Sequence, residues 1–160
     1  YRDGSGAPPP SQMELFDKNF SDVQIMVNGQ IVHIILLHTV PSYHFGNPAT
    51  PNYVRNADQL RFLEWYLTGE TDFEVPENIK HKFTPLAKDS QFIAVGDFNA
   101  DIKGDNDGPL VLRRLAKKTK LWVDNPSYTN ESPGFSPKRT KLLLDYILVS
   151  KNISIHRLLI

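Results

Sequence analysis

The sequence has no cysteine among its 160 residues and no excess of either charge, with 18 basic and 18 acidic side chains. The missing thiols exclude disulfides and thiolate chemistry, although they do not identify a compartment. No apolar run is long enough to span a membrane, and no signal peptide is visible. Proteins that bind long nucleic acids usually carry a basic excess, so the charge balance disfavours that class.

The length and the hydrophobic content of 40% allow one ordinary core, and we expect a single domain over residues 1–160.

The most informative stretch is residues 91–101. Its apolar residues 92–95 predict a short buried strand that ends at Gly96, where the backbone can turn and allow close approach. Asp97 and Asn99 follow two residues apart, and α/β sheets place their chemistry at this end of a strand. Asp and Asn are also common in turns after strands, and this stretch alone favours neither interpretation.

A hairpin and a helix are predicted upstream. Alternating apolar residues 23–27, the Asn28-Gly29 pair and the apolar run 31–37 predict a hairpin whose second strand is buried on both faces and ends at His38. Asn56 resembles an N-cap in a capping-box variant with Gln59, and helical spacing of leucines predicts a helix that ends at Thr68-Gly69 and covers a sheet.

The remaining pattern predicts shorter elements. Residues 1–12 are predicted to be the end of a strand followed by a proline-rich loop. After them come a long loop over 41–55, a loop with one helical turn over 70–90, a helix over 109–118 and a strand over 121–123. A turn-rich loop over 128–140, with the basic cluster Lys138, Arg139 and Lys141, and a strand over 142–149 complete the pattern. The last strand carries Asp145 in an apolar setting, where a carboxylate is costly unless it is paired.

Three motifs together resemble the endonuclease/exonuclease/phosphatase superfamily, the metal-dependent phosphoesterases related to deoxyribonuclease I. Gly96-Asp97-Phe98-Asn99-Ala100-Asp101 resembles its GDFN(A)D signature. Residues 34–41 resemble its strand that ends in a histidine, and residues 144–150 resemble its LDYIL(V/L)S strand. Tyr1-Arg2-Asp3-Gly4 fits an earlier strand, and the three motifs occur in the family's order.

The resemblance implies an α/β (α+β) fold, a four-layer sandwich of two packed mixed β-sheets with helices on the outer faces. The family's first strands, which carry an Asn and a metal-binding Glu, and its last Ser-Asp-His strand are missing from residues 1–160. We therefore expect either a fragment or segments joined across gaps. The second is favoured because half of a two-sheet sandwich would leave a core face bare.

The resemblance also implies the site. Asp97, Asn99, His38 and Asp145 would be catalytic, with Asp97 and Asn99 near a metal ion that is Mg²⁺, or Mn²⁺ or Ca²⁺ as alternatives. Asp97 would orient or deprotonate water, Asn99 would bind a phosphate oxygen, and His38 would stabilise the developing charge or protonate the leaving group. Asp145 would orient the histidine of the missing last strand.

The implied activity is hydrolysis of a phosphoester by metal-activated water in a monomeric enzyme. Nucleic acid, a sugar or nucleotide phosphate, and a phospholipid headgroup all stay open as substrates. The alternative is a catalytically degenerate member that acts as a binding module. The proline-rich loop over 41–55 and the helix that follows it resemble secreted or envelope bacterial members of the family more than its apurinic endonucleases. Together with the absent cysteines and the charge balance, this resemblance favours a secreted or envelope location over a cytoplasmic one.

Overall fold

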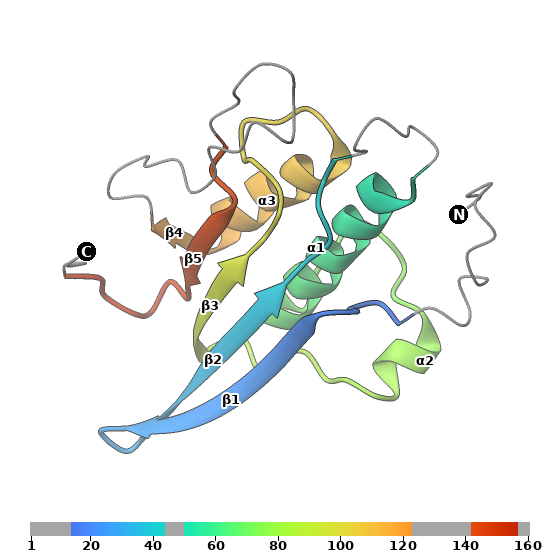
Figure 1. Cartoon of the computed structure of the whole chain (residues 1–160). Coiled ribbons are helices and arrows are strands. Elements are labelled where there is room, and N and C mark those ends of the chain that lie inside the picture. Colours follow the sequence, from blue (N-terminus) through green and yellow to red (C-terminus); the bar gives the residue numbers. More distant parts are fainter. Residues whose placement is uncertain (1–13, 44–49, 123–141, 157–160) are drawn as a thin grey trace.

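The computed structural model describes residues 14–43, 50–122 and 142–156, which form one mixed sheet with helices packed on one face (Figure 1). The strands are β1 (Asn19–Val27), β2 (Gln30–His38), β3 (Gln91–Asp97), β4 (Lys120–Trp122) and β5 (Asp145–Val149). The helices are α1 (Asn52–Thr68), α2 (Glu77–Lys80) and α3 (Asp107–Lys118). The sheet order is β1-β2-β3-β5-β4, and only β2 and β3 are parallel. The predicted α/β class is confirmed.

The predicted β1–β2 hairpin is confirmed. Val27 pairs with Gln30, so the turn is the two residues Asn28 and Gly29, with φ of 50° and 79°. Positive φ at both positions is the turn geometry that matches the twist of paired strands, and Asn-Gly adopts it readily.

The core lies between the sheet and the two longer helices. Side chains of alternate strand residues, including Ile35 and Ala94, face α1 and α3, and Leu63 and Leu112 cover them. Figure 1 shows α1 and α3 side by side behind the sheet. No helix of the described residues is long and apolar enough to cross a membrane.

The opposite face of the sheet, called the outer face below, remains apolar and partly exposed. Val23, Ile25 and Leu36 are 47%, 42% and 39% exposed there. Full burial of β2 on both faces was therefore a wrong prediction for the described residues, because their helices cover one face only. The second sheet of the sandwich is not among the described residues.

The start of α1 also differs from the prediction. The helix begins at Asn52 after Pro51, whose φ of −72° suits a helix start, and not at Asn56. Asn56 lies inside the helix and is fully buried. Its amide does not cap the helix but hydrogen-bonds to residues of another segment, such as Val40. The predicted end is confirmed: Gly69 has φ of 74° and its N–H donates to Trp65 O.

The other elements match with small shifts. The one-turn α2 and the end of α3 are as predicted. Helix α3 starts at Asp107, two residues before the predicted Pro109, and β5 starts at Asp145 and not at residue 142. Predictions for residues 1–12 and for the basic cluster Lys138, Arg139 and Lys141 lie outside the described residues.

A buried ionic cluster joins α1 to α3. Glu64 is fully buried on α1, and its two carboxylate oxygens accept hydrogen bonds of 2.8 and 2.9 Å from Arg114 Nε. Lys118 Nζ lies 3.0 Å from the same carboxylate. Only the carboxylate is fully buried, because Arg114 and Lys118 are 31% and 28% exposed and also pair with Asp72 and Glu70.

We expect Glu64→Gln to lower the free energy of unfolding by about 1–3 kcal/mol, because the buried side chain loses its ion pairs with Arg114 and Lys118. Glu77→Gln is the control, since water and salt screen the exposed Glu77–Lys80 pair and its loss should barely change the free energy of unfolding. Urea denaturation of both variants measures the difference. Equal, small effects would show that the α1–α3 cluster contributes little.

Candidate active site

Three of the four predicted site residues lie in one row across the sheet. His38 at the end of β2 is the Cα partner of Asp97 at the end of β3, and Asp97 is the partner of Asp145 at the start of β5. Directly opposite residues on paired strands project from the same face. The row therefore lies on the outer face, at the carboxyl ends of the two parallel strands.

The row is open and charged. His38 Nε2 lies 3.6 Å from Asp97 Oδ2, and their side chains are 42% and 33% exposed. Asp145 is exposed as the first residue of β5, so the expected cost of a carboxylate in an apolar setting does not apply. The apolar part of that strand begins only after it.

Asp97 carries an electrostatic cost. Burial is the largest cause that raises the pKa of its carboxyl group above the ordinary value, and the Asp145 carboxylate raises it further. The hydrogen bond from Asn99 N and the nearby His38 and Lys18 act in the opposite direction. The Asp145 carboxylate thus disfavours the charge of Asp97, and such a raised pKa is typical of sites that hold a cation or exchange a proton.

Asn99, the fourth predicted residue, is positioned by the backbone. It adopts a φ of 47°, its N–H donates to Asp97 Oδ1 over 2.8 Å, and its side-chain Nδ2 donates to Thr39 O over 2.8 Å. Asp97 therefore also stabilises a turn, as the plainer interpretation of the sequence proposed. Asp97 Oδ2 lies 3.6 Å from His38 Nε2, and Thr39 O is the one acceptor of Asn99 Nδ2 among the described residues.

Gly96 is required by the packing of β3 against β2. Its φ is 152°, and a Cβ on it would overlap the backbone carbonyl of Leu37. No side chain could be accommodated without moving the main chain of β2, so Gly96 fixes the approach of His38 to Asp97.

Two buried polar residues of α1 support the site, and the sequence analysis gave them a different role. Asn56 Nδ2 donates to Thr39 Oγ1, Val40 O and Phe98 O at 3.1, 2.7 and 3.1 Å. Gln59 Oε1 accepts from Val40 N over 2.8 Å. Both are fully buried. Their signal in the sequence is that they continue the apolar stripe of the helix, which a solvent-facing cap would not do.

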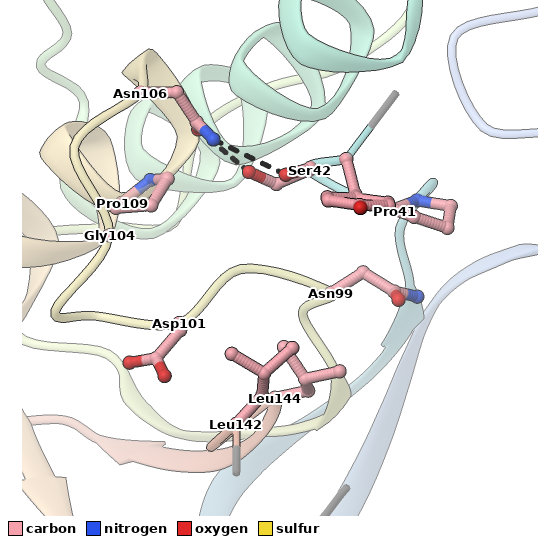
Figure 2. Close-up of a pocket in the computed structure, with 10 residues that line it drawn as sticks. Pro41, Ser42, Asn99, Asp101, Gly104, Asn106, Pro109, Leu142 and Leu144 are labelled. Carbon is pink, nitrogen blue, oxygen red and sulfur yellow. Dashed lines mark hydrogen bonds between the residues drawn. The ribbon is translucent and has the colours of Figure 1, made fainter. Parts of the chain in front are cut away.

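A cavity of about 270 Å³ opens beside Asn99 (Figure 2). Pro41, Asp101 and Leu144 form part of its wall. Figure 2 shows Asn106 bonded to Ser42, whose Oγ donates over 2.7 Å and whose carbonyl accepts over 3.2 Å. Of the four predicted site residues, Asn99 lines this cavity, and His38, Asp97 and Asp145 do not.

No family model matches the sequence, and no curated protein matches it. Solved structures do match. Beta toxin from Staphylococcus aureus is 23% identical with a TM-score of 0.52, over 84% of this chain and 43% of that one. Sphingomyelinase C from Streptomyces griseocarneus is 17% identical with a TM-score of 0.50, over 85% and 43%, and SmcL is 23% identical with a TM-score of 0.52, over 85% and 44%.

These similarities establish the fold, which is the deoxyribonuclease I-like fold that the motifs predicted. This chain spans less than half the length of the structures that it matches.

We expect Gly96→Ala to destabilise the protein by about 3 kcal/mol or more, because backbone strain and overpacking each cost about 1–3 kcal/mol. Gly69→Ala is the matched control. Gly69 also has a positive φ, of 74°, but open space around it, so that variant should lose only about 1–2 kcal/mol. Thermal melts of both variants test the close approach, and equal losses would contradict it.

The raised pKa of Asp97 predicts a pH dependence of stability. The protonated Asp97 carboxyl group contributes to stability, and this contribution is fully present below the pKa of the unfolded state, 3.8. The contribution is lost as the pH rises through the higher pKa of the folded state. Asp97→Asn keeps an acceptor for Asn99 N–H but never ionises. In metal-free buffer, its melting temperature should therefore rise relative to wild type between about pH 3 and pH 7. A difference that stays constant across this range would contradict the prediction.

Proposed function

We propose that this chain forms part of a divalent-cation-dependent phosphoesterase whose chemistry takes place at the His38–Asp97–Asp145 row and Asn99. The observation that carries the proposal is the lateral register of the three row residues on one face of the sheet. Groups from three strands, far apart in the sequence, converge where α/β sheets place reacting groups.

The similar structures support the phosphoester class. They include a sphingomyelinase C, and all share this fold at or above a TM-score of 0.50. Among the substrates left open by the sequence, we favour the phosphodiester of a phospholipid headgroup, with the cavity beside Asn99 available to a group next to the phosphate. An exported location agrees with this substrate.

The donors present fit a hard divalent cation such as Mg²⁺. Asp97 and Asp145 offer carboxylate oxygens, and Asn99 Oδ1 accepts no hydrogen bond from the described residues. Oxygen donors are those that Mg²⁺ prefers, and it keeps several waters. The raised pKa of Asp97 reflects a negative charge that a bound cation would stabilise. The described residues contain no group of three His, Cys, Asp or Glu side chains that could hold a metal.

The chain's own residues divide the chemistry. When bound, the cation polarises the phosphoryl group and stabilises developing negative charge. Asp97 Oδ2 orients the attacking water and accepts its proton, while Oδ1 stays engaged with Asn99 N. His38, when protonated, donates a hydrogen bond to a phosphoryl or leaving oxygen. Asn99 donates its second amide hydrogen to a phosphoryl oxygen without charge repulsion.

Asp145 holds a second negative charge at the row. It stabilises the positive charge of a protonated histidine or of the cation, and its exposed position leaves it accessible to either.

We expect Asp97→Asn to lower hydrolysis of bis-p-nitrophenyl phosphate and of sphingomyelin by about 10²–10⁴-fold at saturating Mg²⁺, the usual contribution of a positioned acid or base. Initial rates of the purified protein, with and without EDTA, measure the effect. Added Mg²⁺ should also raise the melting temperature of wild type more than that of the variant.

Asp105→Asn is the control, because Asp105 is an exposed carboxylate of the loop between β3 and α3, outside the row. It should retain wild-type rates. Wild-type turnover in Asp97→Asn would restrict Asp97 to its turn. Absence of hydrolysis in the wild-type protein, with phosphate bound, would favour the binding module instead.

A further inference from the structure

Lys18 extends the row by a fourth charged group. It lies directly before β1, and its Nζ is 2.8 Å from His38 Nε2. The same imidazole nitrogen is 3.6 Å from Asp97 Oδ2 on the other side. Across the rim of the sheet, the order is therefore lysine, histidine and aspartate, with Asp145 beyond them. The sequence motifs give no role to Lys18.

The segment that carries Lys18 is anchored to α1. Gln59 Nε2 donates to Leu15 O over 2.7 Å, and Arg55 Nη2 donates to Glu14 O over 3.0 Å. The Phe16 ring packs on Phe20 and Phe62 with centroids 5.0 and 5.7 Å away. Lys18 is exposed, yet the residues before it have fixed positions. The ammonium group is therefore presented to the rim by a defined backbone.

Lys18 has no carboxylate partner among the described residues. The preceding Asp17 pairs with Arg55 over 3.3 Å, and the Lys18 ammonium group lies beside the His38 ring. Its charge nevertheless reaches the row, where it acts to lower the pKa of Asp97. An ammonium group has three donors, so it can keep His38 and still bind another acceptor.

The row needs such a charge to bind an anion. Asp97 and Asp145 repel a phosphoryl group, and a divalent cation held by them offsets that repulsion only on their side. On the other side of His38, the positive charge that the described residues supply is the ammonium group of Lys18. Charge-assisted hydrogen bonds from an ammonium to a phosphoryl oxygen are among the stronger polar contacts.

We propose that Lys18 binds a non-bridging phosphoryl oxygen of the substrate beside His38. This inference rests on the proposed function and adds a substrate-binding residue to it. Lys18 fixes the phosphoryl group through charge and does not take part in proton transfer. Lys18 binds the phosphoryl group in the ground state as well as in the transition state. Its loss should therefore affect KM more than kcat.

Binding of inorganic phosphate to the wild-type protein, measured by isothermal titration calorimetry, tests the proposal without any need for turnover. We expect Lys18→Met, which keeps the aliphatic stem, to weaken phosphate binding by about tenfold. Lys18→Arg keeps the charge and should recover most of the affinity. Lys88→Met is the control, because Lys88 is exposed before the start of β3, at the opposite end of the sheet. It should bind phosphate like wild type.

Steady-state kinetics with bis-p-nitrophenyl phosphate provide the second measurement. Lys18→Met should raise KM by about tenfold and leave kcat within about threefold. Unchanged phosphate affinity in Lys18→Met, an equal loss in Lys88→Met, or failure of wild type to bind phosphate would overturn the role of Lys18. The two proposals fail separately. An inactive wild type whose phosphate binding depends on Lys18 would refute only catalysis, and normal kinetics in Lys18→Met beside an inactive Asp97→Asn would refute only the role of Lys18.

Discussion

The side-chain amide of Asn56 is the contact on which the candidate site depends. Its two N–H groups serve three acceptors, one on each of Thr39, Val40 and Phe98, which belong to the segments that follow β2 and β3. A single buried side chain of α1 thus links the loop that follows His38 to the loop that carries Asn99. The link holds only while α1 keeps its place on the sheet, and the Glu64 cluster on the same helix fixes α1 to α3. Asn56 has a side chain that could cap a helix, but it hydrogen-bonds to residues outside the helix instead.

The rim combines several unfavourable features in one place. Gly96 and Asn99 both have positive φ, and Asp97 between them carries a carboxylate whose ionisation burial disfavours. The hydrogen bond from Asn99 N to Asp97 Oδ1 and the packing of Phe98, which is fully buried, hold this arrangement. Strain and charge concentrated at a few residues are typical of functional sites, where the remaining fold supplies the compensation.

Features with a local signal were predictable from the sequence. Asn28-Gly29 specifies its own turn, and the apolar residues before Asp97 specify a buried strand. The motifs also placed His38, Asp97 and Asp145 at a common rim, where the register now brings them together. The role of Asn56 depends on acceptors 16 to 42 residues away, and the contact of Lys18 depends on a strand pairing that puts His38 20 residues further along the chain. Neither follows from neighbouring residues. The exposure of Leu36 was missed because an apolar run does not reveal which face is covered.

The outer face changes character along its length, from apolar residues such as Ile25 and Leu36 to the charged row at its rim. A layer packed on the apolar part would end beside His38 and Asp97 without touching them. It would replace water with a medium of low dielectric constant on one side of the row, and the attraction between a bound cation and the two aspartates would become stronger. In the proposed function, the strength of cation binding would thus also depend on residues that contact neither the cation nor the substrate.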